Sequence, residues 1–253
     1  MSEWWQTFFD TDYLLLWEGT EPETAERVVE GLWQLLGLST GSRVLDAPCG
    51  YGRIAHALAM REVVVVGVDY SEVLLAAAER RRGTVPRAQL RYERQDLRVP
   101  LADSGFDAAL NIYSSLGYGS EADDLAILAT LRAAVRPGGR VFIETAHRDR
   151  MVVYLSQSVH RAIRLADGTL FFEEPRFDAI SGRVESTWYW EGPRGSGRKN
   201  SSLRVYSATE LAGLLARAGL RLLSAHNGCS PEAFRPAGPE MSTRLGLLAV
   251  RDE

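Results

Sequence analysis

One stretch constrains the fold more than any other: residues 44–53, which read Val-Leu-Asp-Ala-Pro-Cys-Gly-Tyr-Gly-Arg. An apolar run ends in Asp46, Gly50 and Gly52 follow, and a helical pattern of apolar residues begins at Arg53. A buried strand that enters a helix through a Gly-x-Gly turn is typical of the first unit of a parallel α/β sheet. Glycines in such a turn let the backbone approach a ligand closely. The stretch therefore predicts a parallel sheet and a ligand site at the carboxyl end of its first strand.

The rest of the chain continues this alternation of short apolar runs and helical patterns. A first helix is predicted from the capping box of Thr20 and Glu23 to Gly37. Further helices are expected over 53–60, 74–82, 121–135 and 208–218, and strands over 43–46, 63–69, 90–94, 106–113, 140–145, 220–225 and 245–251. This order predicts a doubly wound α/β fold of the Rossmann-like kind, with a mostly parallel seven-stranded sheet and a C-terminal antiparallel strand.

Residues 160–205 interrupt the alternation. They have turn signals at Asp167-Gly168 and Ser181-Gly182, and a stretch rich in Gly, Arg and Asn over 192–200 that we interpret as a loop. We expect an antiparallel β insertion after the fifth strand, which covers the substrate or forms a dimer face. Residues 1–253 are then a single domain.

The N-terminal residues 1–36 are predicted to form a helical lid. Their aromatic residues recur at spacings of three and four, which is typical of an amphipathic helix. Such a helix would close over a bound ligand. The alternative is plain packing against the edge of the sheet.

Composition limits the classes of function. Lys and Arg number 29 and Asp and Glu 33, a net charge of -4 that gives no overall attraction to nucleic acid or to an anionic membrane. No apolar run reaches the roughly 20 residues of a membrane helix, and the N-terminus lacks a signal peptide's basic start, so we expect a cytoplasmic protein. Cys49 and Cys229 have no Cys or His companions, so neither a metal site nor a disulfide is expected.

The glycine turn alone fits two classes of ligand. Gly50, Gly52 and Ala55 satisfy the dinucleotide pattern G-x-G-x-x-G/A, and Asp69 lies at about the 20-residue distance expected of an acid that holds ribose hydroxyls. A dinucleotide would place its pyrophosphate at the helix N-terminus, where Asp46 would repel it. S-adenosylmethionine has no phosphate, and Asp46 would attract its ammonium group. Charge therefore favours S-adenosylmethionine.

With these motifs in this order, the chain resembles the class I S-adenosylmethionine-dependent methyltransferases from about Arg43 to the C-terminus. Residues 106–113 resemble the family's fourth strand, and 131–140 its following helix, Pro-Gly-Gly turn and fifth strand. Residues 206–220 are similar to the small-molecule branch that includes sugar N-methyltransferases. The sequence Asn-Ile-Tyr-Ser from Asn111 lacks the Pro-Pro-aromatic run of enzymes that methylate nucleobase amino groups. The resemblance thus implies a methyltransferase (EC 2.1.1.-) with a small-molecule N or O acceptor. We expect either a monomer or a homodimer.

The resemblance also implies roles for particular residues. Asp46 and the glycines would line the methionine part of the cofactor, and Asp69 would bind its ribose. Tyr70 would pack beside the adenine, and Asp96 and Leu97 would meet the adenine edge. The residues placed at the cofactor are Asp46, Ala47, Gly50, Gly52, Arg53, Asp69, Tyr70, Asp96, Leu97 and Asn111.

Three further residues are candidates for catalysis. The family's reaction is an in-line displacement at the sulfonium methyl, so the protein must mainly align donor and acceptor and exclude water, and no metal is required. Tyr113 and Tyr118, which follow the fourth strand, could attract the sulfonium through cation–π interaction. His147 follows the fifth strand and could act as a general base. Its alternatives are a substrate-positioning group or a solvated loop residue.

Two other functions stay open. A nicotinamide-dependent oxidoreductase shares the glycine pattern. Asp46 argues against it, as does the lack of a Tyr-x-x-x-Lys constellation in a chain whose one lysine is Lys199. A non-catalytic regulator that binds the cofactor is the second. The intact acids and glycines argue against lost binding, although not against lost transfer.

Overall fold

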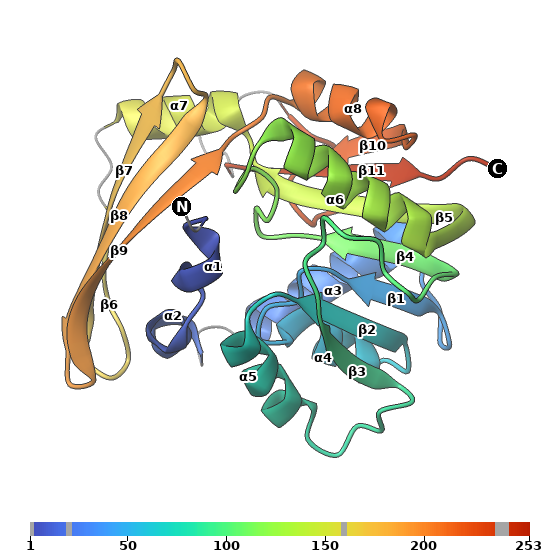
Figure 1. The fold of residues 1–253 in the computed structure, drawn as a ribbon, viewed down its shortest axis with the longest axis horizontal. Helices are drawn as coiled ribbons and strands as arrows, with labels where there is room; N and C mark the ends of the chain where they lie inside the picture. The colour runs from blue at the N-terminus through green and yellow to red at the C-terminus, as the bar shows by residue number, and fades with distance from the viewer. Residues whose placement is uncertain (1–2, 19–21, 158–160, 236–242) are drawn as a thin grey trace.

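The computed structural model describes residues 3–18, 22–157, 161–235 and 243–253. Its main sheet consists of β1 (Arg43–Asp46), β2 (Val64–Asp69), β3 (Leu90–Arg94), β4 (Phe106–Asn111), β5 (Val135–Ala146), β10 (Arg221–His226) and β11 (Arg244–Val250). The strand order is β10-β11-β5-β4-β1-β2-β3 (Figure 1). β11 runs antiparallel to β5 and β10, whereas the pairs among β1 to β5 are parallel. The predicted doubly wound, seven-stranded sheet is therefore confirmed.

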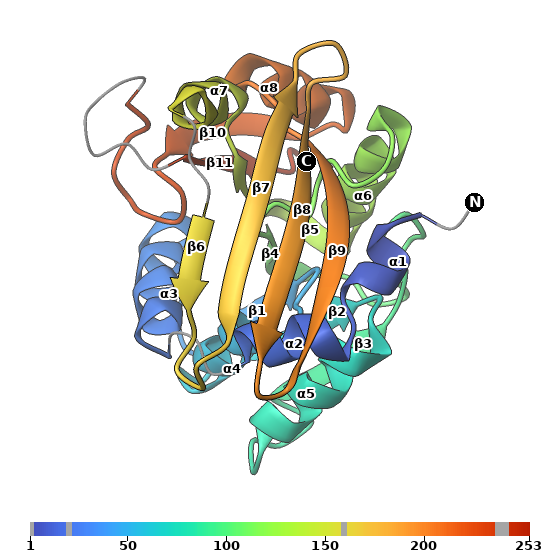
Figure 2. The same cartoon turned by 90° about the vertical axis from the view of Figure 1, so that its left-hand side faces the viewer.

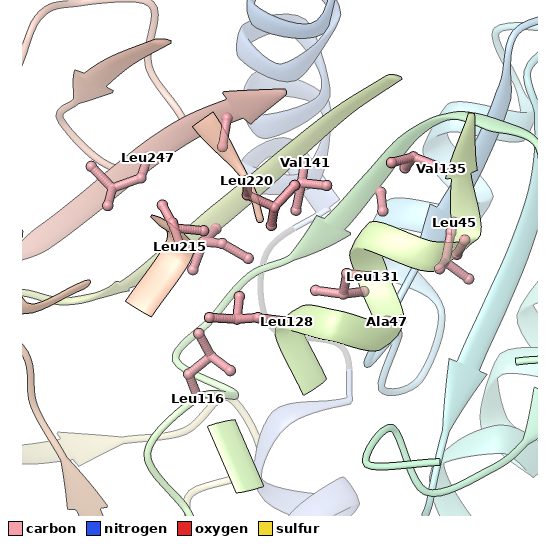
Figure 3. Packing of buried hydrophobic residues seen from close by; sticks show 14 of the residues in the cluster. Leu45, Ala47, Leu116, Leu128, Leu131, Val135, Val141, Leu215, Leu220 and Leu247 are labelled. Atoms are coloured by element: carbon pink, nitrogen blue, oxygen red, sulfur yellow. The ribbon is translucent and has the colours of Figure 1, made fainter. Parts of the chain in front are cut away.

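Helices cover both faces of this sheet, so its central strands are buried on both sides. α6 (Glu121–Ala134) and α8 (Ala208–Arg217) cover one face, where their leucines pack on the strands (Figures 1 and 3). The labelled residues of this core include Leu45, Leu128, Leu131, Val141, Leu215 and Leu247. α3 (Pro22–Leu36) and α4 (Arg53–Ala59) pack on the other face, and α5 (Glu72–Arg82) packs beside β3 and α4.

α6 and α8 begin at the predicted residues, Glu121 and Ala208, whereas α5 begins at Glu72, two residues before its predicted start at 74. Serine residues cap all three helices. The Ser71 hydroxyl accepts a hydrogen bond from the first turn of α5. Ser120 and Ser207 each form a reciprocal capping box with the acidic residue three positions later. The capping box predicted at Thr20 and Glu23 involves Thr20, which lies outside the described residues.

The predicted antiparallel insertion is a second, four-stranded sheet (Figure 2). After α7 (Arg148–Ser156), its strands are β6 (Arg161–Arg164), β7 (Leu170–Asp178), β8 (Arg183–Gly192) and β9 (Gly195–Arg204). The loop predicted over 192–200 is wrong, because residues 195–204 pair with β8 along their whole length. Gly197 serves this pairing: a Cβ there would lie 2.2 Å from the indole of Trp190. Cross-strand packing thus outweighs a composition that favours a loop.

Two short helices, α1 (Trp5–Phe8) and α2 (Thr11–Trp17), lie between the main sheet and the insertion (Figures 1 and 2). Phe8, Tyr13 and Trp17 surround Trp188 of β8, with ring centroids 4.9, 6.1 and 5.9 Å away. α3, by contrast, packs in the main core. The predicted lid comprises residues 1–36. Among its described residues, those that precede α3 reach the space between the two sheets.

Candidate functional site

A cavity opens at the carboxyl ends of β1, β2 and β4, where open α/β sheets bind ligands. Residues of the N-terminal segment, among them Phe9 and Tyr13, complete its wall. Nine of the residues predicted at the site line it: Asp46, Gly50, Arg53, Asp69, Tyr70, Asp96, Leu97, Tyr113 and Tyr118. The order of the parallel strands thus brings together side chains that lie far apart in the sequence.

Gly50 and Gly52 are both required in the turn, but for different reasons. Their φ angles are +55° and +77°, in the left-handed region that favours glycine. A Cβ on Gly50 would meet no atom of the described residues within 4 Å, and Gly50 lines the cavity. A Cβ on Gly52 would lie 2.4 Å from the Tyr92 hydroxyl. Gly50 therefore leaves room for a ligand, whereas Gly52 allows the turn to pack on β3.

Asp46 is a buried acid with an unused oxygen. Its side chain is 1% exposed, and it accepts a hydrogen bond from the backbone of Ala55. Its Oδ2 has no hydrogen-bond partner among the described residues. Burial raises the pKa of Asp46 to about 7. A buried carboxyl that lacks a partner is costly unless a cation or donor joins it, so this oxygen is suited to a ligand's positive group.

Arg53 lies at the other side of the glycine turn, as the first residue of α4. Its guanidinium carbon is 5.2 Å from the ring centroid of Tyr51 and 4.9 Å from that of Tyr113. In the described parts of the chain, its side chain makes no ion pair or hydrogen bond, although it lines the cavity. A guanidinium held between two rings is well placed to bind a carboxylate. Asp46 and Arg53 therefore match a ligand that carries both an ammonium and a carboxylate.

Asp69 ends β2 and lies under the glycine turn. Its Oδ2 accepts a hydrogen bond from the backbone of Gly50 at 2.8 Å, and its Oδ1 from the backbone of Ser71 at 2.9 Å. Burial raises the pKa of Asp69, and these backbone hydrogen bonds oppose that effect. A carboxylate can accept about four hydrogen bonds, so Asp69 retains capacity for hydroxyl donors of a ligand.

The far end of the cavity is lined by Tyr70, Asp96 and Leu97. The carboxylate of Asp96 is held by Arg98, whose Nη2 donates to Oδ2 at 2.6 Å. This hydrogen bond lowers the pKa of Asp96. The sequence prediction did not include Arg98, although its position two residues after Asp96 is a usable signal. Asp96 is thus an ionised acceptor of fixed orientation.

The turn after β4 places Tyr113 in the cavity wall. Tyr113 and Ser114 both have φ of +64°, which costs about 1–3 kcal/mol for each residue that is not glycine. The Glu144 carboxylate accepts the backbone N–H of Tyr113 at 2.8 Å and pairs with Arg244, which donates to the Ser114 hydroxyl at 2.8 Å. The Glu144–Arg244 pair therefore holds a strained turn in place.

Comparison with known proteins identifies the central part of the chain. Residues 44–139 match the model of a family described as methyltransferase domain. Over these residues the chain is therefore similar to methyltransferases. The 2-phytyl-1,4-naphtoquinone methyltransferase of Synechococcus elongatus is 38% identical over 117 residues, which are 43% of this chain and 47% of that protein. The chain spans about half the length of the curated relatives that it matches.

Solved structures resemble the main sheet and the insertion together. The CcbJ methyltransferase from Streptomyces caelestis has a TM-score of 0.78 at 17% identity, covering 98% of this chain and 99% of that chain. CalS10, an amino pentose methyltransferase from Micromonospora echinaspora solved with S-adenosylmethionine, has a TM-score of 0.68 at 19% identity, covering 95% of each chain. The fold is therefore that of the class I methyltransferases, and the resemblance predicted from the sequence is confirmed.

Four residues predicted at the site do not line the cavity: Ala47, Gly52, Asn111 and His147. The Asn111 amide donates to the carbonyl of Ala47 at 2.9 Å and so supports the glycine turn from within the core. His147 is buried, and its Nδ1 accepts the backbone N–H of Arg150 at 3.4 Å, which caps α7. Burial lowers the pKa of His147. A general-base role for His147 stays a prediction, and its observed contacts are structural.

Across the described ranges, no helix of this protein combines the length and apolar content that crossing a bilayer requires.

Proposed function

We propose that this protein transfers a methyl group from S-adenosylmethionine to a nitrogen or oxygen atom of a small molecule. The observation that carries the proposal is the pair of opposite charges, Asp46 and Arg53, that flank the open space at Gly50. The cofactor's amino-acid end has one ammonium and one carboxylate, which match these two groups. A nicotinamide dinucleotide has a pyrophosphate there instead, which Asp46 would repel.

The rest of the cavity also suits this cofactor. Asp69 has remaining acceptor capacity for a ribose hydroxyl, and Tyr70 and Leu97 offer apolar surface for the adenine. Asp96 would accept a hydrogen bond from the adenine amino group. The relatives named as a naphthoquinone methyltransferase and an amino pentose methyltransferase support a small-molecule acceptor.

The protein's own residues align the reactants and exclude water. When bound, S-adenosylmethionine supplies a methyl group on a positively charged sulfur. The rings of Tyr113 and Tyr118 form part of the cavity wall and attract cations. Burial raises the pKa of Tyr113 to about 12 and also raises that of Tyr118, so both phenols keep their protons at neutral pH. The tyrosines would therefore orient an acceptor by donating hydrogen bonds and would not remove its proton.

The test is calorimetric titration with S-adenosylhomocysteine, NADH and NADPH. We expect S-adenosylhomocysteine alone to bind, and Asp69→Ala to weaken that binding about tenfold or more, because hydrogen bonds to a charged acceptor contribute about 1.5–3 kcal/mol. The matched control is Asp149→Ala, whose carboxylate is exposed and pairs with Arg148. Binding of only a nicotinamide would favour the oxidoreductase. Binding of S-adenosylhomocysteine without transfer to any acceptor in a broad screen would favour the regulator.

A further inference from the structure

The N-terminal segment forms one wall of the cavity at its far end. Glu3 and Trp5 line the cavity beside Tyr70 and Leu97. The ring centroids of Trp5 and Tyr70 are 5.0 Å apart, with an interplanar angle of 76°. Two aromatic rings in edge-to-face contact thus stand where the proposed function places the adenine. A flat heteroaromatic group is the class of ligand that such a wall favours.

Arg98 fastens this wall to the rest of the site. Its Nη1 donates to the Glu3 carboxylate at 2.9 Å and to Asp123 at 3.2 Å, while its Nη2 donates to Asp96. Its guanidinium carbon also lies 5.2 Å from the ring centroid of Trp5. Isolated exposed ion pairs contribute little, but this arginine is half-buried and joins three acids and a ring. Arg98 therefore connects the acid at the adenine edge with the N-terminal segment.

Two more hydrogen bonds fasten the segment to loops of the cofactor site. The Ser71 hydroxyl, next to the ribose acid, donates to the carbonyl of Phe9 at 2.6 Å. The Tyr51 hydroxyl, in the glycine turn, donates to the carbonyl of Trp17 at 3.0 Å. The segment is thus held by the same loops that would hold the cofactor, so occupancy of the site and closure of the segment should be coupled.

We propose that Trp5 is a cofactor-binding residue that packs against the adenine nucleoside. The ion pair of Arg98 with Glu3, here called the latch, holds the N-terminal segment over that nucleoside. This inference rests on the proposed function, because the nucleoside is that of S-adenosylmethionine. Departure of the bound nucleoside then requires the latch between Arg98 and Glu3 to open. Trp5 contributes affinity, whereas the latch contributes residence time.

The experiment compares variants by calorimetry and by stopped-flow release of S-adenosylhomocysteine. Trp5→Ala should raise the Kd at least about fivefold, as expected from loss of a base–aromatic contact, and should weaken binding of adenosine by a similar factor. Arg98→Met should speed release of S-adenosylhomocysteine by about threefold to fivefold, the effect of an ion-pair network of moderate strength. Glu3→Gln should speed release in the same direction.

A matched control is the contact between Arg61 and Trp33 of α3, which lies outside the cavity lining. Arg61 lies 5.8 Å from the ring centroid of Trp33 and pairs with Glu26 and Glu30, and neither Arg61 nor Trp33 lines the cavity. Arg61→Met and Trp33→Ala should leave affinity and release rate unchanged. If the unaltered protein binds S-adenosylhomocysteine but the Trp5 and Arg98 variants behave as these controls do, the inference is wrong. If the unaltered protein binds none, the proposed function itself fails.

Discussion

Asp46 makes the pH dependence of cofactor binding predictable, because burial raises its pKa to about 7 in the free protein. Its carboxyl group is then mostly protonated at pH 6, and a ligand's ammonium favours the ionised form. Binding below pH 7 must therefore release a proton. We expect the affinity for S-adenosylhomocysteine to fall about tenfold for each pH unit between 7 and 5, since one pKa unit corresponds to about 1.4 kcal/mol. Titrations in buffers of different ionisation enthalpy measure the released proton directly.

The control for this titration is Asp46→Asn, which keeps the size of the side chain and removes its charge. Its binding should be weaker at pH 8 and should change little between pH 7 and pH 5. A pH-independent affinity of the unaltered protein over the same range would contradict the placement of the ammonium at Asp46.

At the residue scale, the sequence predicted where side chains lie better than where they point. Asp46 and Asp69 are at the cavity because each ends a parallel strand, and strand ends can be read from apolar runs. His147 also follows a strand, but its ring turns back to cap α7. Nothing in the local pattern distinguishes these two directions, because the choice depends on packing partners such as Phe234, whose ring centroid lies 5.0 Å from that of His147.

At the scale of elements, the two glycines of the turn between β1 and α4 have different roles, one in ligand binding and one in folding. Gly50→Ala adds a methyl group into open space, so its cost to the fold is mainly the left-handed φ, about 1–2 kcal/mol. The same methyl group would occupy space that the cofactor needs. We expect Gly50→Ala to remain folded. Its affinity for S-adenosylhomocysteine should be at least about tenfold weaker, which corresponds to about 1.4 kcal/mol of binding free energy. Thermal unfolding and calorimetry on one preparation measure both effects.

Gly52→Ala is the informative comparison, because its Cβ would meet the Tyr92 hydroxyl and the Ala78 side chain inside the fold. This variant should lose more thermal stability than Gly50→Ala. Equal stability loss in the two variants, or an unchanged affinity in Gly50→Ala, would show that Gly50 and Gly52 do not have these separate roles in binding and folding.

Elements with a clear local pattern were predicted, whereas β9 and α7, which lack one, were not. The starts of α5, α6 and α8 follow from caps a few residues long. β9 is rich in Gly, Arg, Ser and Asn and is a strand because β8 pairs with all of it. α7 was not predicted either, because it begins with Arg-Asp-Arg and has no clear apolar face.

At the scale of the whole molecule, the two sheets meet at the loop that follows β4. Gly117 has φ of +93°, and a Cβ there would lie 2.2 Å from the carbonyl oxygen of Arg204 in β9. Arg183 of β8 donates to the carbonyls of Gly117 at 2.9 Å, Tyr118 at 3.0 Å and Gly119 at 3.2 Å. Tyr118 and Gly119 line the cavity. The insertion is thus joined to the main sheet through the cavity wall itself.

Because of these contacts, we expect a substitution in the insertion to alter the affinity for the cofactor. Arg183→Met leaves three carbonyls of the loop without their charged donor, and we expect it to destabilise the protein by about 2–3 kcal/mol. Because the freed loop carries Tyr118, S-adenosylhomocysteine affinity should fall as well. Arg198→Met is the matched control, since Arg198 is exposed and lies over the ring of Tyr189. Thermal unfolding and calorimetry distinguish the outcomes: lower stability with unchanged affinity would mean that the insertion only supports the fold, whereas loss of both means that it shapes the site.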